Sequence, residues 1–151
     1  MRIAIAGGTG TLGSLVAAEL TERGHDVRVL SRNAPEYRVD LTTGAGLARA
    51  LEGCDVVVDA SNNSSRHAAE ILVEGSRRLL AAERAAGVGH HVCVSIVGCE
   101  QVPMSYFRVK AQREAAARVA SASSWNCVAR TMLHGTGPSS VTRSCWALTR
   151  K

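Results

Sequence analysis

The sequence predicts a doubly wound α/β fold, in which helices cover both faces of a parallel sheet. Short, nearly continuous apolar runs alternate with longer stretches of helical periodicity along the chain. Runs of this kind are typical of parallel strands that are buried on both faces. A glycine-rich loop joins the first apolar run to the first helical stretch. We expect one domain over residues 1–137 and an irregular basic tail over residues 138–151.

The strands are expected where apolar and β-branched residues cluster in runs of four to nine residues. About six strands are predicted, at residues 2–7, 26–31, 36–41, 55–61, 90–98 and 125–131. The run at 55–61 is rich in valine and is the strongest of them, whereas the run at 36–41 is the weakest.

The helices follow from the spacing of apolar residues and from the glycines that end them. Four helical stretches are predicted: one through residues 12–20 that ends at Gly24, a short one that ends near Gly53, a long one over 64–86 that Gly87 stops, and one over about 105–121. Glycine ends helices because it adopts the left-handed conformation without steric cost.

Composition and charge exclude several classes of protein. Hydrophobic residues make up 46% of the chain and charged residues 21%, which is ordinary for a globular protein. The net charge of +5 lies entirely in residues 115–151, which hold five basic residues and no acidic one. No basic helix accompanies it, so we expect no nucleic-acid partner. Neither a signal peptide nor a membrane span is visible, so we expect a cytoplasmic protein with no membrane partner.

Cysteine and histidine residues do not predict disulfides or a metal site. The five cysteines are odd in number and lack C-x-x-C spacing, so we expect reduced thiols, with Cys93 and Cys127 acting as small core residues. His90 and His91 are neighbours on a predicted strand and point to opposite faces, and His134 is isolated. We expect no metal and a structural or surface role for all three.

The glycine loop predicts a phosphate-binding site. "AGGTGTLG" spans residues 6–13, with glycines at 7, 10 and 13 and an extra one at 8. A tight turn, close approach of the backbone to a pyrophosphate and close helix–strand packing each require the absence of a side chain. The alternative is a glycine turn without a nucleotide. The candidate cofactor-binding residues here are Gly7, Gly8, Thr9, Gly10, Thr11, Leu12 and Gly13.

The end of the second strand bears on the choice of cofactor. It reads Ser31-Arg32-Asn33, without the acidic residue that binds the ribose 2′-hydroxyl of NAD. Arg32 can pair with a 2′-phosphate through a bidentate fork, which favours NADP over NAD. The alternative is that Arg32 is an ordinary surface arginine.

Other strand ends contribute further candidate cofactor-binding residues. Asp40 follows the third strand and could reach the adenine. Ala60, Ser61 and Asn62 follow the fourth strand, where open α/β sheets bind ligands.

Tyr106 and Lys110 are candidate catalytic residues. They lie one turn apart on a predicted helix, in a chain with only two tyrosines and two lysines. A nearby ammonium lowers the pKa of a phenol, which prepares tyrosine for general acid–base chemistry. A compact lysine cation can also grip ribose hydroxyls, so Lys110 is a candidate for cofactor binding too. The alternative is a surface pair with no chemistry.

In this order, the segments "GGTGTLG", "LSRN", "VSIVG" and "YFRVK" resemble the atypical short-chain dehydrogenase/reductases, most closely their NmrA-like and isoflavone-reductase-like members. The resemblance covers about residues 1–137. It implies a Rossmann fold and hydride transfer between NADP(H) and a carbonyl or alcohol substrate, a small molecule. It also implies that Tyr106 donates the proton, that Lys110 binds the nicotinamide ribose, and that Ser95 polarises the substrate oxygen.

The chain departs from this family after its sixth predicted strand. Family members continue further and build the substrate pocket there, whereas the end, "PSSVTRSCWALTRK", does not resemble them. We expect a C-terminally truncated or frame-shifted product that lacks the substrate part; the alternative is a short member with a basic tail. The coding DNA beyond the stop codon would distinguish the two.

Three hypotheses about function follow. The first is an NADP-dependent oxidoreductase, the second a non-catalytic NAD(P)-binding regulator that senses redox state, and the third an inactive, incomplete domain. The sequence identifies neither the substrate nor the oligomeric state.

Overall fold

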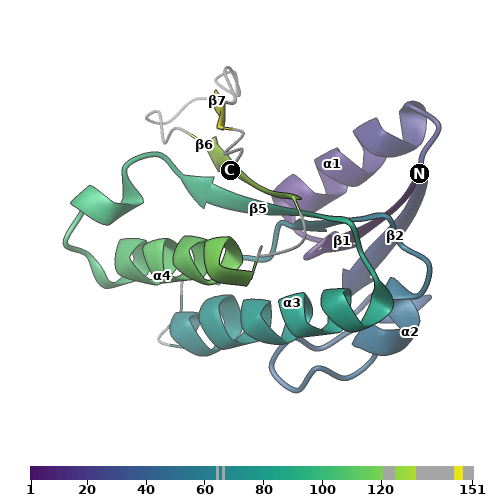
Figure 1. The fold of residues 1–151 in the computed structure, drawn as a ribbon, viewed down its shortest axis with the longest axis horizontal. Coiled ribbons are helices and arrows are strands. Elements are labelled where there is room, and N and C mark those ends of the chain that lie inside the picture. Colours follow the sequence, from purple (N-terminus) through teal and green to yellow (C-terminus); the bar gives the residue numbers. More distant parts are fainter. Residues whose placement is uncertain (64, 66, 121–124, 132–144, 148–151) are drawn as a thin grey trace.

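The computed structural model describes residues 1–63, 65, 67–120, 125–131 and 145–147. Within these residues, seven strands form one sheet in the order β3-β2-β1-β4-β5-β6-β7 (Figure 1). The strands are β1 (Arg2–Ala6), β2 (Asp26–Ser31), β3 (Tyr37–Arg38), β4 (Val56–Asp59), β5 (His90–Ile96), β6 (Trp125–Thr131) and β7 (Cys145–Ala147). Strands β1 to β6 are parallel, and β7 runs antiparallel to β6. The predicted parallel sheet is confirmed.

Helices cover both faces of the sheet. The described helices are α1 (Thr11–Glu22), α2 (Leu47–Leu51), the π-helix η1 (Glu70–Glu74), α3 (Gly75–Ala86), the 3-10 helix η2 (Cys99–Gln101) and α4 (Ser105–Ala120). Helix α1 lies on one face, and α2, α3 and α4 lie on the other (Figure 1). This arrangement confirms the doubly wound Rossmann-like fold. None of the helices in the described ranges is long and apolar enough to cross a bilayer.

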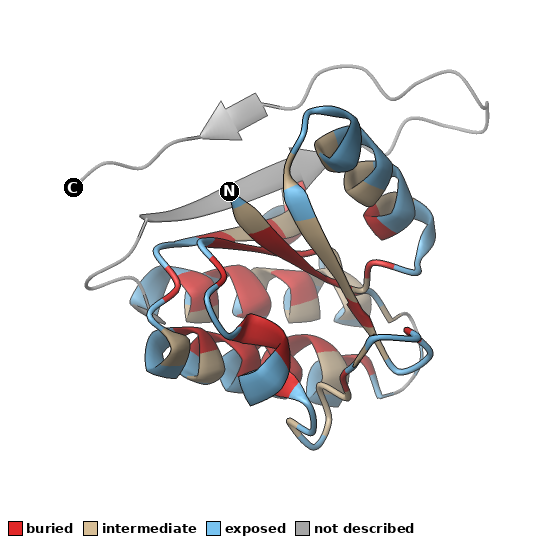
Figure 2. Cartoon of the chain, turned by 90° about the vertical axis from the view of Figure 1, so that its right-hand side faces the viewer, coloured by how far each residue is buried: buried red, intermediate tan, exposed pale blue. Residues whose placement is uncertain are grey.

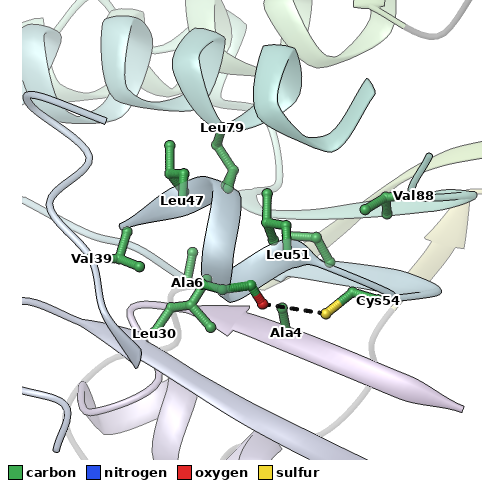
Figure 3. Close-up of a cluster of buried hydrophobic side chains, with 11 residues drawn as sticks. Ala4, Ala6, Leu30, Val39, Leu47, Leu51, Cys54, Leu79 and Val88 are labelled. Carbon is green, nitrogen blue, oxygen red and sulfur yellow. Dashed lines mark hydrogen bonds between the residues drawn. The ribbon is translucent and has the colours of Figure 1, made fainter. Parts of the chain in front are cut away.

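The core consists of two apolar layers, one on each face of the sheet. Between the sheet and helices α2 and α3, Leu47, Leu51 and Leu79 pack against Ala4 and Leu30 (Figure 3). On the other face, α1 covers a smaller cluster built on alternate residues of β1 and β4. Figure 2 shows the buried residues on the sheet and on the inward sides of the helices. The central strands are therefore buried on both faces, which explains their continuous apolar sequence.

The long helix begins later than predicted. It was expected from residue 64, but Ala68 and Ala69 are its first helical residues; η1 follows from Glu70, and α3 continues from it to Ala86. Before the helix, the Asn63 side chain accepts hydrogen bonds from the backbone N–H and the hydroxyl of Ser65, at 2.8 and 2.6 Å. This local turn competes with helix formation, as asparagine and serine side chains commonly do. The predicted stop at Gly87 is confirmed, since its φ is +72°.

Several strands are shorter than predicted for similar local reasons. Strand β3 ends at Arg38 instead of residue 41, and shortly beyond it Asp40 accepts hydrogen bonds from the backbone and hydroxyl of Thr42. Strand β5 ends at Ile96, and Gly98 then turns the chain with a φ of +71°.

The first helix was predicted to end at Gly24. Helix α1 ends at Glu22, two residues before this glycine.

The C-terminal tail was predicted to be irregular. Its residues Cys145–Ala147 instead form strand β7, which pairs with β6. The other residues of the segment 138–151 lie outside the described residues, and so do residues 132–137, which include His134.

A buried ion pair links α3 to β5 beneath the sheet. His91 is 2% exposed, and its Nδ1 lies 2.9 Å from the Glu83 carboxylate. Burial opposes the charge on His91, but the neighbouring Cys93 side chain, the hydrogen bond to Glu83 and the nearby carboxylates of Glu83 and Asp59 outweigh it and raise the pKa of His91 to about 10. His90, the next residue along the strand, is exposed. The two neighbours therefore point to opposite faces, as predicted.

We expect His91 to make stability depend on pH. Its pKa is raised from 6.5 to about 10 on folding, so its stabilisation is complete below pH 6.5 and is lost as pH rises toward 10. The free energy of unfolding of the wild type should therefore fall relative to that of His91→Gln across this range, as measured by urea denaturation. Taking the difference cancels the opposite contribution of Lys110, whose pKa is lowered to about 8. Parallel pH profiles for the two proteins would contradict the expectation.

Candidate functional site

A cleft opens at the carboxyl edge of the sheet, where the strand order reverses between β1 and β4. Its volume is about 520 Å³. It is lined by the loops that follow β1, β2, β3 and β4, by the last residues of β5, by Ile71 of η1 and by the first turns of α4. Open α/β sheets bind their ligands at this switch point. Of the predicted site residues, those lining the cleft are Gly7, Thr9, Gly10, Thr11, Leu12, Ser31, Arg32, Asn33, Asp40, Ala60, Ser61, Asn62, Ser95, Tyr106 and Lys110.

The glycine loop is shaped by contacts that exclude side chains. Gly7 has a φ of +75°, and a Cβ on it would lie 2.8 Å from the backbone of Ser61. A Cβ on Gly13 would overlap the carbonyl oxygen of Gly7. Gly8 is buried against Val29. Gly8 and Gly13 therefore do not line the cleft; they allow the close packing that shapes it.

Helix α1 presents to the cleft an N-terminus that no side chain caps. Its N-cap, Gly10, makes no side-chain capping hydrogen bond, and its first turn contains no acidic residue. The first intrahelical hydrogen bond is donated by Ser14 to the Gly10 carbonyl, at 2.9 Å. The N–H groups of Thr11, Leu12 and Gly13 precede it, and with the helix dipole they suit a phosphate. The bare glycine backbone and these donors fit a dinucleotide.

The loop after β2 lies beside the glycine loop. Arg32 and Asn33 are exposed at the rim of the cleft. The carbonyl of Arg32 accepts a hydrogen bond from Nε of Arg38, at 2.8 Å. Asp40 lines the same end, but one of its oxygens accepts two hydrogen bonds from Thr42, which lower its pKa. Arginine at this position suits a 2′-phosphate, whereas part of the Asp40 carboxylate is already engaged.

Tyr106 and Lys110 lie at the opposite end of the cleft. Nζ of Lys110 lies 5.6 Å from the centre of the Tyr106 ring. The Tyr106 hydroxyl donates a hydrogen bond to Oδ1 of Asn62, at 2.8 Å. Ser95 lines the cleft from the end of β5, with its Oγ 3.9 Å from the Cys99 sulfur. Helix α4 thus brings both predicted residues to the side of the cleft that holds Ser95.

Lys110 is buried, and no hydrogen bond or ion pair joins its ammonium to another described residue. Burial lowers its pKa to about 8, and the neighbouring Arg113 guanidinium adds to this effect. A buried cation in this position, with no hydrogen bond or ion pair to the described residues, fits the hydroxyl groups of a ribose.

Sequence reasoning missed the buried polar network behind the cleft. Asp59 and Arg113 form an ion pair of 2.6 Å and are both essentially inaccessible to solvent. Burial would raise the pKa of Asp59, but Arg113, His91 and the hydroxyls of Ser61 and Ser76 lower it to about 2. An aspartate ending a valine-rich strand is the one signal that could have revealed the network, because a buried carboxylate requires a cationic partner.

The apolar wall of the cleft was not predicted either. It comes from seven apolar residues that adjoin the predicted polar ones: Ala6, Leu30, Val39, Leu41, Ile71, Val94 and Ile96. Across the described ranges, no three His, Cys, Asp or Glu side chains are grouped so that they could hold a metal ion. Cys54, Cys93 and Cys99 are buried free thiols, whereas the side chain of Cys127 lies outside the description.

Comparison with known proteins assigns the family. The profile of the NAD(P)H-binding family matches residues 7–134, which include the glycine loop, the cleft and helix α4. The chain belongs to this NAD(P)H-binding family. Its solved neighbours include a short-chain dehydrogenase/reductase superfamily protein and an NAD-dependent epimerase/dehydratase, which share the fold at 23% and 22% identity. The family match agrees with the resemblance to the atypical short-chain group.

Two curated relatives illustrate the range of functions in similar proteins. One is a photosystem II assembly factor, Ycf39, from Synechocystis, with 31% identity over 68% of this chain and 36% of the relative. The other is a (4-alkanoyl-5-oxo-2,5-dihydrofuran-3-yl)methyl phosphate reductase from Streptomyces griseus, with 33% identity over 74% of this chain and 40% of the relative. The chain therefore spans about two fifths of the length of these relatives.

Solved structures share the fold and were determined with both kinds of cofactor. UDP-glucose 4-epimerase from Thermus thermophilus, in complex with NAD, matches with a TM-score of 0.73 and 26% identity, over 86% of this chain and 54% of that protein. An NADPH-dependent quinone oxidoreductase from Escherichia coli, in complex with NADPH, matches with a TM-score of 0.71 and 21% identity, over 85% and 48%. NAD(P) binding is thus a property of the family, and the preference between the two cofactors is a separate question.

We expect Gly7→Ala to abolish cofactor binding, because its Cβ would push the loop away from the backbone of Ser61. Gly24→Ala is a matched control: its φ is +80°, but nothing lies within 4 Å of the added Cβ. The control should lose about 1–2 kcal/mol of stability from left-handed strain and bind NAD(P)H normally. Isothermal titration with NADPH checks both variants. Tight binding by a folded Gly7→Ala variant would contradict this role of the loop.

Proposed function

We propose that this chain forms the cofactor-binding part of an NADP(H)-dependent oxidoreductase that interconverts a carbonyl and an alcohol on a small-molecule substrate. The observation that carries the proposal is that Tyr106 and Lys110 face the same cleft as the glycine loop. The reductase among its relatives supports the reaction class. We also propose that the protein is one of the NmrA-like proteins and is located in the cytoplasm.

Different residues of the chain would bind different parts of the cofactor. The glycine loop and the N-terminus of α1 would hold the pyrophosphate, Arg32 the 2′-phosphate, and Lys110 the nicotinamide ribose. NADP(H), when bound, supplies or accepts the hydride. Ala60, Ser61 and Asn62 would flank the cofactor at the end of β4, and Asp40 the adenine.

Tyr106 would exchange a proton with the substrate oxygen. Its hydroxyl already points into the cleft, where it donates to Asn62, so a substrate oxygen would compete with Asn62 for the same proton. The ammonium of Lys110, 5.6 Å from the centre of the Tyr106 ring, would stabilise negative charge that develops on the Tyr106 oxygen as the proton leaves. Ser95 would donate a hydrogen bond to the same substrate oxygen.

A second candidate is a non-catalytic NAD(P)-binding regulator. The similarity to an assembly factor favours it, as does the fact that the Tyr106 hydroxyl is satisfied by Asn62 within the protein. In such a protein the cleft would bind cofactor with the same residues, and Tyr106 would only shape its wall.

Tyr106→Phe separates the two candidates. The substitution keeps the ring and removes the proton, so turnover should fall about 10²- to 10⁴-fold while the Kd for NADPH changes by less than about threefold. Turnover is followed as NADPH oxidation with a panel of aldehydes, ketones and quinones. Tyr37→Phe, in β3, is the control and should retain activity. Full turnover by Tyr106→Phe would overturn the catalytic proposal.

Arg32→Gln tests the preference for NADP. Loss of a charge-assisted contact of about 1.5–3 kcal/mol should weaken NADPH binding roughly 10- to 100-fold and leave NADH binding unchanged. Nicotinamide fluorescence measures both affinities. Arg23→Gln, at the far end of α1, removes another exposed arginine and should change neither affinity. An equal loss for both cofactors would show that Arg32 does not recognise the 2′-phosphate.

A further inference from the structure

Arg113 is the largest fully buried side chain among the described residues, and the proposed chemistry does not use it directly. Its Nη2 lies 2.6 Å from Oδ1 of Asp59 and donates a hydrogen bond to the Asp59 carbonyl, at 2.8 Å. Its Nη1 donates to the Ser61 carbonyl, at 2.9 Å. One guanidinium on α4 thus holds both the side chain and the backbone at the end of β4.

Asp59 completes the link between three elements. Its Oδ1 accepts hydrogen bonds from the backbone N–H and the hydroxyl of Ser61, at 3.1 and 2.6 Å. Its Oδ2 accepts one from the hydroxyl of Ser76 on α3, at 2.7 Å. Strand β4, α3 and α4 therefore meet at one buried carboxylate.

The network ends at the two candidate catalytic side chains. Asn62, whose Oδ1 accepts the hydrogen bond from the Tyr106 hydroxyl, follows Ser61 directly. On α4, Arg113 lies three residues after Lys110 and seven after Tyr106, on the same side of the helix. Arg113 is thus linked to both partners of the Tyr106–Asn62 hydrogen bond: it shares helix α4 with Tyr106, and it donates to the carbonyl of Ser61, the residue before Asn62.

We propose that Arg113, paired with Asp59, is a positioning residue that sets the place of Tyr106 against Asn62 and the electrostatic environment of Lys110. This inference rests on the proposed function for its meaning in catalysis. A buried ion pair is often no better for stability than apolar residues of similar size, so a role in geometry accounts for it better than stability does.

The positive charge of Arg113 lowers the pKa of Lys110. Burial is the first cause of the lowered pKa of Lys110, and Arg113 is the second. The groups that oppose them are Asp59 on β4, Cys93 on β5 and Cys99 on η2, and the Tyr106 ring lies beside the ammonium. Because Arg113 outweighs Asp59 in this balance, removal of both charges should raise the pKa of Lys110.

The test uses the double variant Asp59→Asn/Arg113→Met, which removes the pair without leaving an unpaired buried charge. The chain contains two lysines and two tyrosines, so ¹³C labelling of their side chains gives two lysine signals and two tyrosine signals. We expect the Lys110 titration midpoint to move upward from about 8 and the ¹³Cζ signal of Tyr106 to shift. Arg108→Met removes an exposed arginine from the same helix and should leave both unchanged.

A folded double variant with wild-type Lys110 and Tyr106 signals would overturn the proposal. If the double variant does not fold, Arg113→Lys decides. This substitution keeps the positive charge, but a lysine cannot reach the carboxylate and both carbonyls at once. The titration midpoint of Lys110 should therefore remain unchanged, whereas the ¹³Cζ signal of Tyr106 should shift. An unchanged Tyr106 signal there overturns positioning. These spectra need no cofactor, whereas failure of the wild type to bind NADPH would count against the proposed function alone.

Discussion

The ion pair between Asp59 and Arg113 is the interaction on which the arrangement of the cleft depends. Two charges buried together cost several kcal/mol each unless hydrogen bonds satisfy them. Here the carboxylate accepts from Ser61 and Ser76, and Nη1 and Nη2 of the guanidinium donate to two backbone carbonyls, whereas its buried Nε has no hydrogen-bond partner among the described residues. Since these partners come from β4, α3 and α4, the pair can form only when the three elements are correctly placed. The buried ion pair therefore favours the one arrangement of these three elements in which both charges are paired.

The two halves of the cleft use different chemistry. The half built by β1 and α1 works through its backbone: the glycines remove side chains, and the helix N-terminus supplies N–H donors. The half built by β4, β5 and α4 works through side chains, among them Tyr106, Lys110 and Asn62. A dinucleotide suits this division, because its phosphates need donors and close approach, whereas the nicotinamide end needs specific groups.

The lysine at position 110 stands out in a chain with sixteen arginines. An arginine there would place a second broad, permanent cation beside Arg113, whereas an ammonium is compact and can lose its proton. The lowered pKa of Lys110 is a consequence of this crowded, buried site. The same geometry would serve a catalyst and a binding regulator. The two functions differ in whether Tyr106 transfers its proton to a substrate.

The sequence by itself determined the local features of this protein. The order of strands and helices, the glycine loop, the polar residues at the strand ends and the Tyr106–Lys110 spacing were all predicted, because each depends on neighbours within one or two turns. The same local reasoning failed where polar side chains capture nearby backbone groups: Asn63 delays the start of the long helix, and Asp40 lies just past the early end of β3. Strand β7 was missed because a three-residue strand takes its pairing from β6 and leaves no periodic pattern.

Only the tertiary structure decided which distant residues meet. Asp59 and Arg113 are 54 residues apart, and Tyr106 and Asn62 are 44 apart, so no spacing in the sequence relates them. Burial also decided the charge states, because the pKa values of Asp59, His91 and Lys110 follow from removal of water and from the charges brought beside them. These effects exist only after the chain has packed, since the same groups in the unfolded chain are solvated and far apart.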